Sequence, residues 1–249
     1  MGNPLGGINE KLKRSREHIF NLQIESDRFF QESGYAVIPQ EDMQLLLKAF
    51  ENLEKLAVPL RFSILAGEIV HHLRSCLDHI VWQFSSPDYR SGKDGRFIEF
   101  PVLESRPRNE NRLTSYERKI KGVSNVAVLD MIERLQPYNS ADPATNALLL
   151  LHNMDITDKH KELVLCVSSG GITVDPHAFR DTMMRHLQGI ITEAEAKAYL
   201  KNYAKFAPMI ALGDFGQGKP KPLIPLLYEL HNFVAGVVAS FSAHLPSPL

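Results

Sequence analysis

The residues from Gly67 to Phe84 concentrate side chains that could do chemistry: three histidines, an arginine and two carboxylates. At about 100° per residue, an apolar stripe that includes Leu73 and Leu77 lies on one side of a helix. The other side has no lysine, although a merely solvated helix face is usually rich in Lys and Glu. We therefore predict a helix with a core on one side and a polar site or interface on the other. That polar side carries Glu68, His71, His72, Arg74, Ser75, Asp78, His79 and Trp82.

A second informative stretch, residues 143–161, begins as a buried helix and ends in a polar cluster around Asp158. If it ends beside the polar face, the site holds a proton-transfer histidine, an arginine and a lysine for an anion, and carboxylates that orient the imidazoles. That inventory suits phosphodiester cleavage without metal, and RNA is the natural substrate because it carries its own nucleophile. The expected catalytic residues are Arg74, His79, Asp78 and His71, and the expected substrate-binding residues are Lys159, His160, Asp158 and His72.

Arg74 and His79 form an R-x4-H element, which resembles the motif of the HEPN superfamily. Members of that superfamily are helical domains that often act as metal-independent ribonucleases, with motifs from two protomers meeting across a dimer interface. The resemblance implies that His79 moves a proton and that Arg74 holds or neutralises the phosphate. It also implies a homodimer. A similar spacing recurs at Arg180 and His186, so the spacing alone is weak evidence for a ribonuclease site.

Four runs in the chain, in this order and at these intervals, resemble a family of uncharacterised bacterial proteins. The central run reads L-R-S-C-L-D-H, and F-P-V, L-Q-P-Y and D-K-H-K follow it. The resemblance spans about residues 60–165 and implies a bacterial or phage source, without a known activity. It indicates that the central helix and residues 158–160 belong together.

Two other interpretations stay open. In the first, Arg74 pairs with Asp78 at i,i+4, the histidines hydrogen-bond within the core, and the chain is a non-enzymatic interaction or accessory protein. In the second, a metal-binding hydrolase uses two carboxylate–imidazole pairs. Its candidate ligands are Glu68, His71, His152 and Asp155. The set lacks the further glutamates of helical di-iron sites, so we expect no metal or other cofactor.

The periodicity predicts a mainly α fold, a helical bundle with a short inserted β-hairpin and strands. We expect one domain over 1–249, with the bundle core at about 9–84 and 124–161 and β or loop insertions at about 87–112 and 162–222. A short basic helix follows residue 112, and Ser124 is the expected cap of the helix after it. Strands are expected at 97–102 and 207–212, with a hairpin within 162–174. Helices are expected near 9–31, 40–57, 62–84, 124–136, 144–160 and 223–243.

The composition is that of an ordinary globular protein, with 44% hydrophobic and 23% charged residues. A net charge of −1 provides no global field that attracts nucleic acid, so any contact with RNA must come from local patches. Cys76 and Cys166 both lie in apolar runs, as reduced cysteines of a cytoplasmic protein do. No apolar run approaches the roughly 18–20 residues of a membrane span. The expected partners are a second copy of the chain, RNA or another protein, and no membrane.

Overall fold

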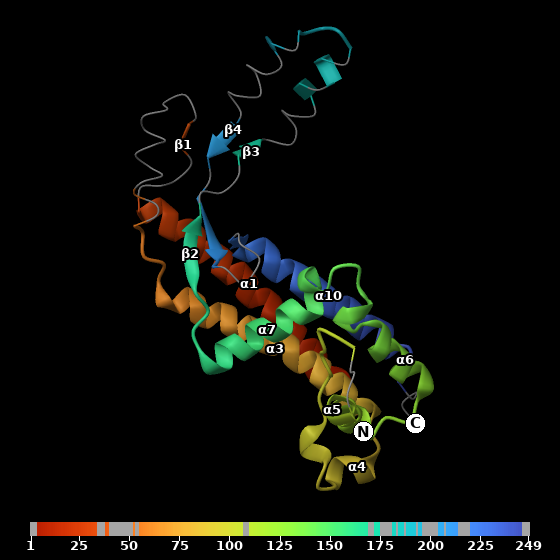
Figure 1. Ribbon diagram of the computed structural model, residues 1–249. Helices are drawn as coiled ribbons and strands as arrows, with labels where there is room; N and C mark the ends of the chain where they lie inside the picture. The colour runs from red at the N-terminus through yellow and green to blue at the C-terminus, as the bar shows by residue number, and fades with distance from the viewer. Residues whose placement is uncertain are drawn as a thin grey trace. The chain divides into compact units, whose positions relative to one another are not determined.

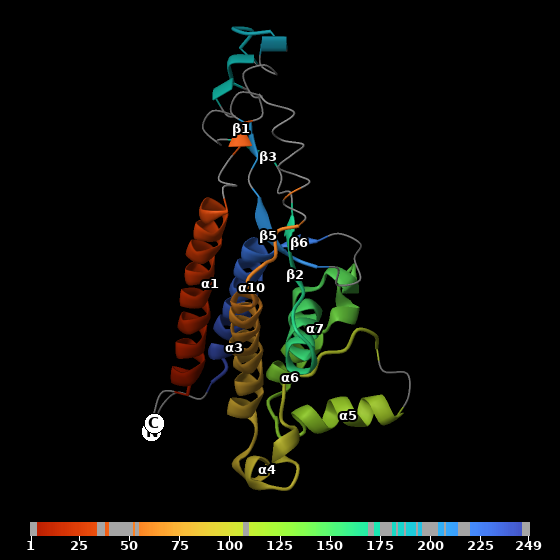
Figure 2. The ribbon, with the colours of Figure 1, turned by 90° about the vertical axis from the view of Figure 1, so that its left-hand side faces the viewer.

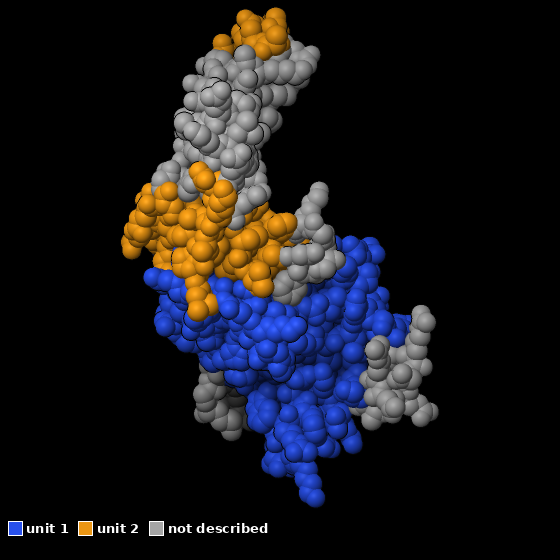
Figure 3. All heavy atoms as spheres, turned by 60° about the vertical axis from the view of Figure 1, so that its left-hand side comes forward, with its two compact units in different colours: residues 1–21, 61–163, 225–249 blue, residues 22–60, 164–224 orange. Residues whose placement is uncertain are grey.

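The computed structural model describes residues 4–33, 38–39, 52, 55–106, 110–168, 172–174, 181–182, 184–186, 188–192, 194–195, 204–206, 208–213 and 220–245. These residues are mainly helical with a minor β component, which confirms the expected fold class. The chain divides into two compact units (Figure 3). The first comprises residues 1–21, 61–163 and 225–249, and the second comprises residues 22–60 and 164–224. The expectation of one domain over 1–249 stays a prediction.

The predicted helices lie within a few residues of their expected bounds. The long ones are α1 (Gly6–Glu32), α3 (Leu60–Phe84) and α10 (Leu223–Ser242). The shorter ones are α4 (Pro87–Ser91), α5 (Glu110–Ile120), α6 (Val126–Arg134) and α7 (Ala147–His160). Three-residue 3-10 turns, η1 (Gly95–Phe97), η2 (Pro137–Asn139) and η3 (Pro143–Thr145), connect some of them. The helix expected at 40–57 lies mostly outside the described residues.

Asparagine side chains define where α6 and α7 begin. Asn125 accepts hydrogen bonds from the backbone amides of Ala127 and Val128, so the cap of α6 is Asn125 and not the expected Ser124. Asn146 accepts from the amides of the second and third residues of α7 in the same way. In both cases the side-chain oxygen satisfies amides that have no partner within the helix, which fixes the first turn.

Within the first unit, α3 lies beside α1 and α7 (Figures 1 and 2). Leu73, Leu77 and Ile80 are almost completely buried, as the apolar stripe predicted. Each such side chain contributes about 2 kcal/mol relative to an exposed position. The ring of Phe241 in α10 lies 6.1 Å from that of Phe84 at the end of α3. The central helix is therefore in contact with elements from both ends of the chain.

α10 is long and apolar enough to cross a membrane by length and composition, and it is the one such helix among the described residues. This corrects the expectation that no run approaches that length. Membrane spans and core helices share this composition. Leu227, Leu230 and Val234 are buried in the first unit. His231, also buried, places its Nε2 3.1 Å from the Leu12 carbonyl of α1, as in a core helix.

The described strands of the second unit form two small antiparallel sheets. One has the order β1 (Ile38–Pro39), β4 (Ala204–Phe206), β3 (Ile172–Val174), and the other has the order β2 (Leu165–Ser168), β5 (Met209–Leu212), β6 (Lys221–Pro222). The strand expected at 207–212 is therefore confirmed.

The prediction of a hairpin within residues 162–174 is wrong. β2 pairs with β5 and β3 pairs with β4, so the two adjacent runs join different sheets. Short apolar runs indicate strands without saying which strand each one pairs with. Thr192 and Glu195 form a capping box, in which each residue's backbone amide donates to the other's side chain.

The strand expected at 97–102 is also absent. Residues Gly95–Phe97 form the turn η1, and residues 98–103 have no strand assignment. The apolar residues Ile98, Phe100 and Val102 occupy every second position, a pattern that resembles a strand locally. Side chains from α3 and from the end of α6 take the backbone hydrogen bonds of this segment instead.

Candidate functional site

Arg74 and Asp78, one turn apart on α3, bind both backbone polar groups of Phe100. The Nη2 of Arg74 donates to the Phe100 carbonyl at 2.6 Å, and its Nη1 lies 2.8 Å from the Oδ1 of Asp78. The same carboxylate oxygen accepts the Phe100 amide at 2.9 Å. Arg74 is only 4% exposed. Burial raises the pKa of Asp78, while Arg74 and the Phe100 amide oppose that shift.

Gln136 holds the next part of the same segment. Its Nε2 donates to the Pro101 carbonyl at 2.9 Å, and its Oε1 accepts the Leu103 amide at 3.1 Å. A third bond runs from Nε2 to the Ile132 carbonyl at the end of α6. Gln136 is almost completely buried. Three polar side chains therefore replace the strand partner that the segment lacks, which satisfies buried backbone groups as folding requires.

Asp155 joins α7 to α3. Its buried carboxylate lies 2.6 Å from the Nζ of Lys159 and 3.5 Å from the Nδ1 of His71. The side chains of Lys159 and His71 are each about half exposed. A buried carboxylate thus orients one imidazole and one ammonium group that still reach solvent. This is the geometry closest to an acid–base pair among the predicted catalytic and substrate-binding residues.

α3 and α7 approach each other closely beside the contact between His71 and Asp155. A Cβ atom at Gly67 would overlap the carboxylate of Asp158, so the absence of a side chain at Gly67 admits the α7 residue. Burial and the neighbouring Asp155 raise the pKa of Asp158. Of residues 158–160, which were expected to belong with the central helix, Asp158 lies against it. Glu68 is exposed beside them, and His160 is exposed in the last turn of α7.

His152 lies one turn before Asp155 on α7, and its side chain is mostly buried. Burial lowers its pKa to about 4, with further lowering by the charges of Arg74 and Lys119. Its Nδ1 atom is buried without a hydrogen-bond partner in the described structure. Lys119 itself forms an ion pair with Glu99. The imidazole is accordingly neutral over the physiological pH range.

The two residues of the R-x4-H element do not meet within the described chain. Five residues of helix turn His79 about 140° away from Arg74. Arg74 faces Phe100, whereas His79 is exposed and His72 lies toward α1, where its ring stacks on that of His18. Within one chain the two residues therefore do not form a common site.

The candidate metal ligands are not gathered into a site. Among the described residues, no group of three or more His, Cys, Asp or Glu side chains is arranged to hold a metal ion. Asp155 contacts His71, but His152 is placed near Arg74, and Glu68 is exposed. The expectation of no cofactor stays a prediction.

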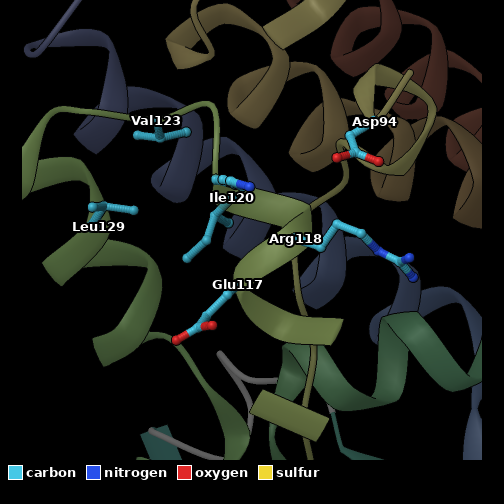
Figure 4. A pocket seen from close by; sticks show the side chains of 7 residues that line it. Asp94, Glu117, Arg118, Ile120, Val123 and Leu129 are labelled. Carbon is cyan, nitrogen blue, oxygen red and sulfur yellow. The ribbon is translucent and has the colours of Figure 1, made fainter. Parts of the chain in front are cut away.

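Two hollows open elsewhere in the first unit. One of about 510 Å³ has Ile120, Val123 and Leu129 along one side, with Asp94 on the other side and Arg118 pointing away from them (Figure 4). The other, of about 450 Å³, lies between α6 and α10 and is mainly apolar. Neither is lined by the polar residues shared by α3 and α7.

The sequence reasoning missed the segment Phe100–Leu103 and its partner Gln136. The runs F-P-V and L-Q-P-Y were recognised in the sequence. The groups of F-P-V that bond to Arg74, Asp78 and Gln136 are backbone amides and carbonyls, however, and the residue types do not indicate which backbone groups form such bonds. It also missed Lys11 and His18 on α1, which a seven-residue spacing on one helix face could have indicated. No family model, no curated protein and no solved structure matches this chain in the comparisons made with each.

Proposed function

We propose that this chain is a non-catalytic helical interaction protein. The observation that carries the proposal is the position of Arg74, which is buried and bonded to the Phe100 carbonyl and the Asp78 carboxylate. An arginine that clamps a substrate phosphate has to present its guanidinium to solvent or to a cleft. The bacterial or phage source and the cytoplasmic location expected from the sequence belong to the same proposal.

Withdrawing Arg74 to serve a substrate would be costly. The Phe100 carbonyl and the partly buried Asp78 carboxylate would both lose their partner, and breaking a buried ion pair costs about 3–5 kcal/mol. Phosphate binding would have to supply that free energy before any catalysis. A fixed structural role for Arg74 has no such penalty.

The proposed interaction surface is the outer face of α3. Ile64 and Trp82 lie on one line of this helix and are 54% and 41% exposed. Ile156 on α7 is 42% exposed. Large exposed apolar side chains of this kind are typical of interfaces when polar residues surround them, as His71 and Glu68 do here. The proposed partner is a second copy of the chain.

Light scattering on a sizing column at micromolar concentration tests this surface. Wild-type protein should have the mass of a dimer, and Ile64→Glu should have the mass of a monomer while keeping its circular dichroism spectrum. The matched control is Val126→Glu on α6, another exposed apolar residue (77% exposed) that should leave the mass unchanged. A monomeric wild-type protein would refute self-association.

Metal-independent RNA cleavage is the second candidate, and the contact between His71 and Asp155 favours it. The half-exposed imidazole is held by a buried carboxylate, which also lies within ion-pair distance of the half-exposed Lys159 ammonium. In this version His71 transfers the proton. Purified protein with total RNA and EDTA should then release fragments, and His71→Ala should lower the rate by about a hundredfold or more. No cleavage by the wild-type protein, with or without EDTA, excludes this candidate.

A further inference from the structure

A row of four basic side chains follows the junction of α1 and α3. Lys11 and His18 are seven residues apart on α1, and His72 and His79 are seven apart on α3. Two turns of helix separate each pair, so each pair lies on one face of its helix. The rings of His18 and His72 are nearly parallel, with centroids 6.1 Å apart and an interplanar angle of 7°. We call these four residues the basic row.

The basic row differs from the cations around the α3–α7 contact in having no ion pair within the described part of the chain. Arg74, Lys119 and Lys159 each lie within ion-pair distance of a carboxylate. Among the described residues, no member of the row does. His72 also has a buried Nδ1 atom without a hydrogen-bond partner. A lysine ammonium and imidazoles that can take up protons, without a carboxylate at ion-pair distance among the described residues, mark a place where an anion would be stabilised.

The surrounding charges set how strongly the row attracts an anion. Burial, Lys11, His18 and His71 lower the pKa of His72, and Glu68 opposes them. Burial and Lys11 also lower the pKa of His79, while Asp78 opposes them. An anion bound to the row would favour both imidazolium forms. Anion binding and proton uptake are therefore coupled with a positive sign.

We propose that the basic row binds a chain of phosphate groups. Seven residues of helix extend about 10 Å, which is longer than one phosphate and suits several in succession. Ammonium and imidazolium groups are strong donors to phosphate oxygens. The shared chemistry is that of a polyphosphate or of a nucleic-acid strand. This goes beyond the proposed function, since it needs neither self-association nor catalysis.

The first experiment measures binding of tripolyphosphate to the full chain by calorimetry at about pH 6 and about pH 8. Binding should be tighter at the lower pH, because protonated imidazoles of the row attract the anion more strongly. Lys11→Gln should weaken binding by about tenfold at both pH values, and His79→Gln should reduce the pH dependence. The matched control is Lys13→Gln, since Lys13 is exposed on the opposite face of α1.

Histidine ring resonances provide a readout that does not depend on the variants. Tripolyphosphate should shift the signals of His18, His72 and His79, and should leave His244, exposed beyond the end of α10, unchanged. A short oligouridylate identifies the source of the phosphates: binding tighter than that of tripolyphosphate, with the same loss in Lys11→Gln, indicates nucleic acid, and weaker binding indicates a free phosphate chain. Absence of binding at about pH 6, or equal losses in Lys11→Gln and Lys13→Gln, would overturn the proposal.

Discussion

Replacing Arg74 with methionine tests the structural role of the buried arginine. The variant keeps most of the aliphatic volume but removes the bond to the Phe100 carbonyl and the ion pair with Asp78. A buried carbonyl left without its partner costs about 1–3 kcal/mol. The Asp78 side chain is 32% exposed, so water recovers part of the ion-pair loss. We expect a total destabilisation of about 3 kcal/mol.

The chain contains a matched control for this substitution. Arg134 and Asp130 form the same i,i+4 pair at 2.6 Å, but the Arg134 side chain is 77% exposed. Arg134→Met should therefore cost no more than about 0.5 kcal/mol. Thermal unfolding followed by circular dichroism separates the two variants, because about 3 kcal/mol corresponds to a shift of about 6–12 °C in a protein of this size.

Hydrogen exchange adds a local readout, since the Phe100 amide is bonded to Asp78 and its protection should fall in Arg74→Met. Equal and small effects of Arg74→Met and Arg134→Met would refute the structural assignment. A folded, fully stable Arg74→Met protein would also return this arginine to the list of possible ligand-binding residues.

Three further predictions follow from the same network. Gln136→Leu removes the side-chain bonds to residues 101–103 and should destabilise the protein by about 2–3 kcal/mol in urea titration, whereas Gln136→Glu should retain part of that stability. Gly67→Ala should destabilise by about 1–3 kcal/mol because the new methyl group displaces Asp158, and the loss should shrink in an Asp158→Ala background. The lowered pKa of His152 predicts stability that is complete above about pH 6.5 and declines toward about pH 4, by about 2 kcal/mol relative to His152→Asn.

The helical part of the fold could be predicted because its pattern is local and strong. The apolar stripe around Leu73 and Leu77 is buried as expected, and the polar end of α7 lies beside α3. Capping signals were also readable, although Asn125 and not Ser124 caps α6. These features depend on neighbours three or four residues apart, which the sequence displays directly.

The pairing of distant segments could not be predicted. The apolar run at 97–102 has a strand-like composition, but no described strand lies beside it, and the side chains of Arg74, Asp78 and Gln136 bond to its backbone. The two strands at 165–168 and 172–174 likewise join separate sheets. A strand's composition records its burial, whereas its partner is set by the tertiary structure.

The buried arginine also explains why residue types alone were a poor guide to a site. Arg74, Asp78 and Gln136 are polar residues of the kind that active sites use, and here they satisfy one irregular segment. Three of the four runs on which the expected bacterial resemblance rests, L-R-S-C-L-D-H, F-P-V and L-Q-P-Y, meet at this segment. The fourth, D-K-H-K, reaches α3 through Asp158. A packing arrangement of this kind gives these runs a structural role that does not require catalysis. The residues that remain accessible, His71, Lys159 and the basic row, are therefore the ones on which an activity has to be sought.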